Sequence, residues 1–371
     1  MFNKTEKTGK NALARLLSLF LRTAPVTAGR LEAETVERLL VIRQQNQMGD
    51  MLCAVPALRG LRKRFPEARI SLVAAAINSE VMRGNPWIDE VLVYDKRMQL
   101  RNPLHLPRFI AGLRRRRFDA AIVLNTVSFS VTSMMLSVAS GARIRIGCSG
   151  AAFGEGLTSR YYHLELPLPS PAELERMHEA RHNLYPLEAI GVVEADLSSY
   201  MATTREDERA CDRLAETIDP EGRGFIVALP GAGKEQNLWP AERFAEAAAR
   251  LSRRFGCPVV AVRGPVDGPA FDRFLAESVA DPPVAVISRP AIGFLAALMR
   301  RASVNLCNDT GVMHIGGAAG ARCVAVFGPT DPARWKPVNE TVVAVRSRDG
   351  KTSSVKVDEV VEAAASLITG S

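Results

Sequence analysis

Short apolar runs alternate with segments of helical periodicity through the first half of the chain. The runs predicted to form strands are Leu39–Arg43, Ile70–Ala74, Val91–Tyr94, Ala120–Leu124 and Arg143–Ile146. Segments with helical spacing lie between them, including Gly49–Phe65 and Pro107–Arg116. Strands that read as continuous apolar runs and alternate with helices are typical of a parallel sheet covered on both faces. This pattern predicts a Rossmann-like unit.

A second alternation of the same kind follows residue 200. Its predicted strands are Phe225–Leu229, Val259–Arg263, Ser303–Cys307, Arg322–Phe327 and Val342–Val345. Helices are expected from Pro240, at Ile292–Arg301 and at Val357–Ile368. A chain of 371 residues is long enough for two domains. We therefore predict an α/β protein of GT-B architecture, in which two Rossmann-like domains (37–200 and 201–371) have parallel sheets that face a cleft.

Residues 1–36 are predicted to form a basic N-terminal extension. Its cationic residues include Lys4, Lys7, Lys10, Arg15, Arg22 and Arg30. Leu13, Leu16, Leu17 and Phe20 share one face at helical spacing, which is typical of an amphipathic helix on an anionic membrane. A disordered tail explains the same composition. A signal peptide is disfavoured, because the apolar core is only about six residues, shorter than usual.

The composition of the chain disfavours several classes of protein. The six cysteines form no CxxC pair and most lie in or beside apolar runs, which predicts buried thiols in a reducing cytoplasm. No segment reaches the roughly 18 apolar residues of a membrane span. The net charge of +8 favours anionic partners. Nucleic acid is disfavoured, because the basic residues are dispersed and lack interleaved aromatic residues.

The segment Asn308–Gly320 is the strongest local signal of chemistry. It follows a predicted strand, begins with the cap-like Asp309-Thr310-Gly311 and continues as a helix of small residues. Such a helix starts at the carboxyl edge of a parallel sheet, where its N-terminal amides and dipole favour phosphate. The backbone amides of Thr310, Gly311 and Val312 are therefore candidate phosphate ligands. A plain βαβ unit without a ligand gives the same pattern.

A second loop, Pro230-Gly231-Ala232-Gly233-Lys234, follows another predicted strand of the same sheet. It departs from the phosphate-binding consensus GxxxxGK[ST], and no GxGxxG follows the first strand of the chain. ATP hydrolysis and NAD chemistry therefore lack a signature. Lys234 remains a candidate cation for a phosphate. His178 and His182 stand four residues apart in a predicted helix, Pro171–Ile190, but a third metal ligand is not evident.

Several ordered motifs together resemble glycosyltransferase family 9, the lipopolysaccharide heptosyltransferases. They are Asp309–Ile315, Phe327–Pro332, Trp335–Pro337, Pro230–Ala232, Trp239-Pro240, Gly49-Asp50 and Val55–Leu58. The resemblance covers nearly everything from about residue 38 onward. Motifs in a compatible order and spacing are far more specific than any one of them alone.

The resemblance implies an inverting, metal-independent transferase without a cofactor. It would move L-glycero-D-manno-heptose from ADP-heptose to a lipopolysaccharide core acceptor, with the N-terminal domain binding the acceptor and the C-terminal domain the nucleotide sugar. The expected place is the cytoplasm, with peripheral contact at the inner face of the inner membrane. Two alternatives keep the fold: a transferase that uses another nucleotide sugar or glycan acceptor, and a catalytically weakened member that binds nucleotide or acts as a scaffold.

One residue, Asp50, matches the proposed general base of the family. The chemistry requires such a carboxylate, because the acceptor hydroxyl must lose its proton as it attacks the anomeric carbon. Inversion in a single displacement needs one carboxylate and no covalent sugar. Read without the resemblance, Asp50 is better explained as a residue that stabilises the start of a helix, and the resemblance reverses this preference.

Four further residues are expected at the donor site. Lys234 would meet the diphosphate, while Asp309 would cap its helix or accept bonds from sugar hydroxyls. His314, one turn into the helix, would face the phosphates or pack in the core. Asp267 occupies a position where the family often has a carboxylate for the nucleoside. The chain departs from the family at Asn237, where a lysine is usual, and Lys234 is the expected substitute.

Overall fold

The computed structural model describes residues 23–27, 36–44, 47–95, 98, 101–126, 129–150, 158–265, 267–278 and 284–370. Within this part, the chain divides into two compact units. Unit 1 holds the described residues before Met48 together with Ala54–Leu197, and unit 2 holds Met48–Cys53 together with the chain from Ser198 onward. The amphipathic segment expected between Leu13 and Phe20 lies outside the described residues.

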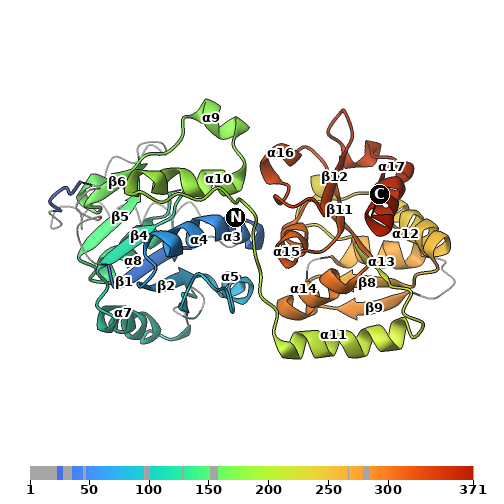
Figure 1. The fold of residues 1–371 in the computed structure, drawn as a ribbon, viewed down its shortest axis with the longest axis horizontal. Helices are drawn as coiled ribbons and strands as arrows, with labels where there is room; N and C mark the ends of the chain where they lie inside the picture. The colour runs from blue at the N-terminus through green and yellow to red at the C-terminus, as the bar shows by residue number, and fades with distance from the viewer. Residues whose placement is uncertain are drawn as a thin grey trace. The chain divides into compact units, whose positions relative to one another are not determined.

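Unit 1 is built on a parallel sheet, to which its described residues contribute six strands in the order β3-β2-β1-β4-β5-β6 (Figure 1). The strands are β1 (Arg38–Arg43), β2 (Arg69–Ala74), β3 (Glu90–Val93), β4 (Ala120–Val123), β5 (Ile144–Cys148) and β6 (Leu164–Leu166). The central strand β1 is buried from Leu39 onward and pairs with β2 on one side and β4 on the other. Burial of both faces explains why these strands read as continuous apolar runs.

Four helices in the described part of unit 1 connect successive strands, and two more, α9 and α10, follow the last strand. They are α4 (Val55–Arg64), α5 (Ala76–Val81), α7 (His105–Arg115), α8 (Val131–Ala139), α9 (Pro171–Arg176) and α10 (Glu179–Leu184), with 3-10 turns η2 (Thr158–Arg160) and η3 (Tyr185–Ile190). The single helix predicted over Pro171–Ile190 is wrong. The backbone of His178 is extended, and its Nδ1 accepts a hydrogen bond from the Ala180 amide at 3.1 Å. Met177 is extended and ends α9, and the cap of His178 starts α10.

Unit 2 has the same plan. Its described residues form a parallel sheet of six strands in the order β12-β11-β10-β7-β8-β9. The strands are β7 (Ile226–Leu229), β8 (Val259–Arg263), β9 (Ala285–Ser288), β10 (Val304–Asn308), β11 (Cys323–Phe327) and β12 (Val342–Arg346). The half-exposed edge strand β9 was not predicted. The two parallel sheets confirm the predicted α/β class and its Rossmann-like halves.

The helices of unit 2 pack on this sheet and on one another. They are α3 (Met48–Leu52), α11 (Arg205–Ile218), α12 (Ala241–Phe255), α13 (Gly268–Glu277), α14 (Ile292–Arg301), α15 (Gly311–Ala319), α16 (Pro332–Trp335) and α17 (Val357–Thr369), with 3-10 turns η4 (Glu235–Asn237) and η5 (Thr352–Ser354). In Figure 1, α11 lies along α14, and α12 lies beside α17. The helix predicted over Gly49–Phe65 is divided into α3 and α4, which belong to different units.

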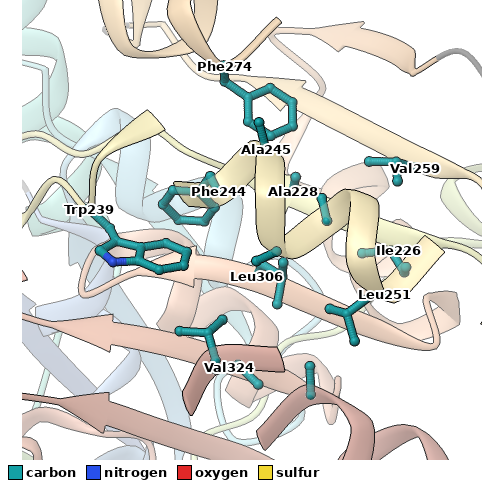
Figure 2. Packing of buried hydrophobic residues seen from close by; sticks show 14 of the residues in the cluster. Ile226, Ala228, Trp239, Phe244, Ala245, Leu251, Val259, Phe274, Leu306 and Val324 are labelled. Atoms are coloured by element: carbon teal, nitrogen blue, oxygen red, sulfur yellow. The ribbon is translucent and has the colours of Figure 1, made fainter. Parts of the chain in front are cut away.

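The core of unit 2 is organised around Trp239, which is 1 % exposed. Its ring meets that of Phe244 edge-on, with centroids 4.9 Å apart, and Leu306 and Val324 belong to the same cluster (Figure 2). The indole Nε1 donates a hydrogen bond to the Val355 carbonyl at 3.1 Å. Trp239 therefore fixes the loop after β7 to the start of α17 without leaving its polar atom unpaired.

All six cysteines are buried free thiols, which confirms the burial predicted for the four in or beside apolar runs, Cys53, Cys257, Cys307 and Cys323. Burial raises the pKa of Cys148 and of Cys323 to about 12. Both thiols stay protonated at neutral pH and are weak nucleophiles. Covalent catalysis by either cysteine is therefore disfavoured.

Candidate active site

Four neighbouring strands bring the candidate donor-site loops of unit 2 together. In the sheet, β11, β10, β7 and β8 are adjacent and parallel, so the loops at their carboxyl ends meet at one edge. The loop after β7 carries Lys234, the loop after β8 carries Asp267, and Asp309 follows β10 directly. The sequence therefore places these three candidates on one edge of one sheet.

Asn308, the last residue of β10, ties two of these loops together. Its side chain is fully buried and its Nδ2 donates hydrogen bonds to the carbonyls of Pro230 and Gly231, at 3.0 and 3.2 Å. Its Oδ1 accepts from the Trp239 amide at 3.0 Å. Both ends of the loop that carries Lys234 are thus fixed to β10. The role of Asn308 was not predicted, although a polar residue that ends an apolar strand was a usable signal.

Asp309 also connects neighbouring loops through hydrogen bonds, and it is only 8 % exposed. Its Oδ2 accepts a hydrogen bond from the Thr330 hydroxyl of the loop after β11. Its backbone carbonyl accepts from Asn237 Nδ2 at 2.9 Å. Burial raises the pKa of Asp309, and the Thr330 hydrogen bond and the positive charge of Lys234 oppose that rise. Asp309 therefore joins three loops, and Lys234 lies close enough to act on its charge.

The N-terminus of α15 is not capped by any side chain of the described residues. The N-cap residue Thr310 is extended, with φ −150° and ψ 177°, and makes no side-chain capping bond. The predicted capping role of Asp309 is therefore wrong, because its carboxylate is directed to Thr330 instead. The first amides of α15, around Gly311 and Val312, are left to face a ligand, in the arrangement that binds phosphate at a helix N-terminus.

Asn237 occupies the position where the resemblance leads one to expect a lysine. It is 7 % exposed and ends η4. Its Nδ2 lies 2.9 Å from the Asp309 carbonyl and 3.4 Å from Oδ2 of Asp309, which fixes the orientation of the amide. Its Oδ1 has no hydrogen-bond partner in the described part of the chain. Asn237 thus holds the loop in place, while the cationic side chain of this loop is the exposed Lys234.

Asp267 organises the loop after β8. Its Oδ2 accepts a hydrogen bond from the Gly264 amide at 2.6 Å. A Cβ added at Gly231 would lie 1.9 Å from Cγ of Asp267, so the loops after β7 and β8 touch at a glycine that no larger residue can replace without movement. Asp267 therefore stands beside the Lys234 loop. Its role toward a nucleoside stays a prediction.

Helix α3, which carries Asp50, packs on α15 within unit 2. A Cβ at Gly49 would lie 2.6 Å from Cδ2 of His314, so the two helices meet without an intervening side chain. Cys53 Sγ lies 3.8 Å from Nδ1 of the same histidine. Asp50 is 8 % exposed. The fold thus packs α3, which carries Asp50, against α15, whose N-terminus is the candidate phosphate site. His314, which is 5 % exposed, forms the contact between these two helices.

The two histidines predicted to lie one turn apart on a helix, His178 and His182, do not form a metal site. His178 caps α10, and Nδ1 of His182 lies 3.3 Å from Oε1 of Glu179. No group of three or more potential metal ligands occurs among the residues that the structure describes. No helix in this part of the chain is long and apolar enough to cross a membrane.

Comparison with known proteins assigns this arrangement to a family. The chain matches glycosyltransferase family 9 (heptosyltransferase) over residues 106–364. The chain belongs to this family and is a glycosyltransferase. Similar curated proteins include lipopolysaccharide heptosyltransferase 3 of Escherichia coli, 23 % identical over 314 residues, which are 80 % of this chain and 85 % of that protein. The lipopolysaccharide core heptosyltransferase OpsX of Haemophilus influenzae is 21 % identical over 326 residues, 85 % and 88 % of the two chains.

Solved structures share the fold. A glycosyl transferase family 9 protein from Veillonella parvula superposes with a TM-score of 0.78 at 22 % identity, covering 94 % of this chain and all of that one. Heptosyltransferase WaaC of E. coli, solved with ADP, superposes with a TM-score of 0.70 at 18 % identity, covering 89 % and 99 % of the two chains. These likenesses confirm the GT-B-like class of the fold.

Proposed function

We propose that this transferase moves heptose from ADP-heptose to a sugar hydroxyl of a lipopolysaccharide core, with inversion and without a metal ion. The observation that carries the proposal is the uncapped N-terminus of α15, with Lys234 acting on the adjacent Asp309. The names of the relatives support the sugar and the acceptor, and ADP in the WaaC structure supports the nucleotide. The chain takes no cofactor in this proposal.

The proposed reaction is a single displacement. The acceptor oxygen attacks the anomeric carbon, the bond from that carbon to the diphosphate oxygen breaks, and Asp50 takes the proton of the acceptor hydroxyl. Charge develops on the leaving diphosphate. The amides at the start of α15 and the ammonium group of Lys234 stabilise this charge, and they replace a metal ion in that role.

The other predicted residues have supporting roles in the proposal. Asp267 contacts the nucleoside, and Asp309 holds the loop of Asn237 while its remaining acceptor capacity faces sugar hydroxyls. His314 positions α3 against α15, so that Asp50 and the phosphate site keep a fixed relation. The acceptor binds to unit 1, and the protein acts in the cytoplasm at the inner face of the inner membrane.

Nucleotide selectivity tests the proposed donor. We expect calorimetric titration in the presence of EDTA to detect binding of ADP, and weaker or no binding of GDP, UDP and CMP. Selective binding of another nucleoside diphosphate would keep the transferase and replace the donor. An absolute requirement for magnesium would contradict the proposed role of Lys234 and α15.

We expect Lys234→Ala to weaken ADP binding roughly tenfold, because it removes one charge-assisted contact from an exposed and partly screened site. Calorimetry without metal measures the change. Lys351→Ala is the matched control, since it removes an exposed lysine that acts on Asp349 instead. Equal affinities for Lys234→Ala and the control would show that Lys234 does not contact the diphosphate.

A further inference from the structure

A hollow of about 360 Å³ lies at the amino edge of the sheet of unit 1. Its lining residues are Arg38, Arg69, Ser71, Glu90, Arg115, Arg116 and Phe118. Arg38, Arg69 and Glu90 are the first residues of β1, β2 and β3. The proposed transfer chemistry uses the opposite, carboxyl ends of strands, so this hollow is a separate feature and does not depend on the proposed function.

The arginines around the hollow come from three distant segments of the chain. Arg115 is the last residue of α7 and Arg116 is its C-cap, and the favourable effect of cations at a helix C-terminus explains their presence there. The same effect does not explain Arg38 and Arg69, which start strands. Guanidinium groups repel one another, and their convergence is unfavourable unless an anion lies between them.

One carboxylate lies among the four guanidinium groups. Glu90 accepts bonds from Nε and Nη2 of Arg116, each at 2.9 Å, and from the Ser71 hydroxyl at 2.7 Å. Arg69 is farther away, with its Nε 3.8 Å from Glu90. Glu90 therefore fixes the guanidinium of Arg116 as one rigid wall of the hollow.

The positive charges of the other arginines that line the hollow are not neutralised by a lining carboxylate. In the part of the chain that the structure describes, the guanidinium of Arg38 donates only a long 3.5 Å bond to the Arg116 carbonyl, while its backbone amide donates to Oδ2 of Asp119 at 3.0 Å. Neither Arg38 nor Arg115 forms an ion pair among these residues. Four guanidinium groups against one carboxylate leave three positive charges around the hollow. Arg69 keeps 65 % of its side chain exposed, so it can turn toward a ligand.

We propose that this hollow, the arginine pocket, binds a phosphate monoester group. Several guanidinium forks from different directions match the geometry of a phosphate better than that of a single carboxylate. The volume is in the range of small-ligand sites and accommodates the group to which the phosphate is attached. Such a monoester occurs on a phosphorylated glycan and on the headgroup of phosphatidic acid.

The test compares the wild-type protein with Arg38→Gln/Arg115→Gln. Each is titrated with inorganic phosphate in calorimetry at low ionic strength, with ADP present so that phosphate does not enter the α15 site. We expect phosphate binding to weaken roughly tenfold or more in the double variant. Arg38→Lys/Arg115→Lys should retain part of the affinity. Arg209→Gln/Arg213→Gln, on the exposed face of α11, is the control for the loss of two charges.

Co-sedimentation with phosphatidylcholine vesicles, with and without phosphatidic acid, distinguishes the two sources. If the wild type binds vesicles with phosphatidic acid and the double variant does not, the ligand is a lipid headgroup. If the wild type binds phosphate but no vesicles, the ligand is a soluble phosphate monoester. Thermal unfolding checks that each variant is folded. The proposal is overturned if the folded double variant binds phosphate as well as the wild type, or if the wild type binds none.

Discussion

Replacing Asp50 by asparagine is expected to lower turnover about 100- to 10,000-fold, the range over which a positioned general base contributes. The change keeps the size of the side chain and removes its ability to accept the proton of the acceptor hydroxyl. Affinity for ADP should change little, because the proposed diphosphate contacts come from α15 and Lys234. Steady-state rates and nucleotide calorimetry on the same preparation separate the two effects.

Asp212→Asn is the matched control for this substitution. Asp212 is an exposed carboxylate on α11 that pairs with Arg301 at 3.1 Å, so its loss changes the charge equally without touching the site. A variant with near-normal turnover and lost nucleotide binding would instead make Asp50 part of the donor site.

The Trp239→Ala variant of unit 2 is expected to lose about 3–5 kcal/mol of unfolding free energy, the usual cost of deleting a fully buried large aromatic side chain. The change leaves a cavity against Phe244 and removes the bond to the Val355 carbonyl. The bond from the Trp239 backbone amide to Asn308, which helps to hold the loop of Lys234, is retained in alanine, so ADP binding should weaken much less than stability. Urea unfolding followed by circular dichroism measures the stability.

Trp335→Ala provides the comparison, because Trp335 lies on the short helix α16, which has no buried residue. Its removal should cost much less than that of Trp239. A Trp239→Ala protein as stable as Trp335→Ala would show that the core of unit 2 does not depend on the indole.

Most of the fold could be predicted because buried parallel strands carry an unmistakable pattern. β1 after its first residue, β4, β7 and β10 are buried on both faces, and the sequence alone placed all four. β6 and β9 were missed, since they are short edge strands of three and four residues with mixed exposure. The end of α9 at Arg176 was also missed, because neither a glycine nor a proline marks the extended residues Met177 and His178.

The positions of the candidate site residues could be predicted where each residue follows a strand. They could not be predicted where a residue acts through hydrogen bonds to residues that are distant in the sequence. Lys234, Asp267 and Asp309 were placed because each follows a strand of one sheet. The roles of Asn308 and Thr330 depend on partners that are 69–78 and 21 residues away. Local propensity indicated that Asp309 would cap α15, whereas the tertiary contact with Thr330 takes its carboxylate away from the helix.

The departure at Asn237 has a structural explanation. Asn237 is buried and its amide holds the Asp309 carbonyl, so the position holds the loop and supplies no cation. Lys234 acts on the charge of Asp309 from the same loop. In the proposed transfer, Lys234 is the cation that takes the place of the usual lysine.

The most direct test is transfer itself. We expect the protein, in EDTA, to add heptose from ADP-heptose to lipopolysaccharide that lacks core heptose, and nuclear magnetic resonance of the product to show an anomeric configuration opposite to that of the donor. Retained configuration, or transfer from another nucleotide sugar but not from ADP-heptose, would contradict the account.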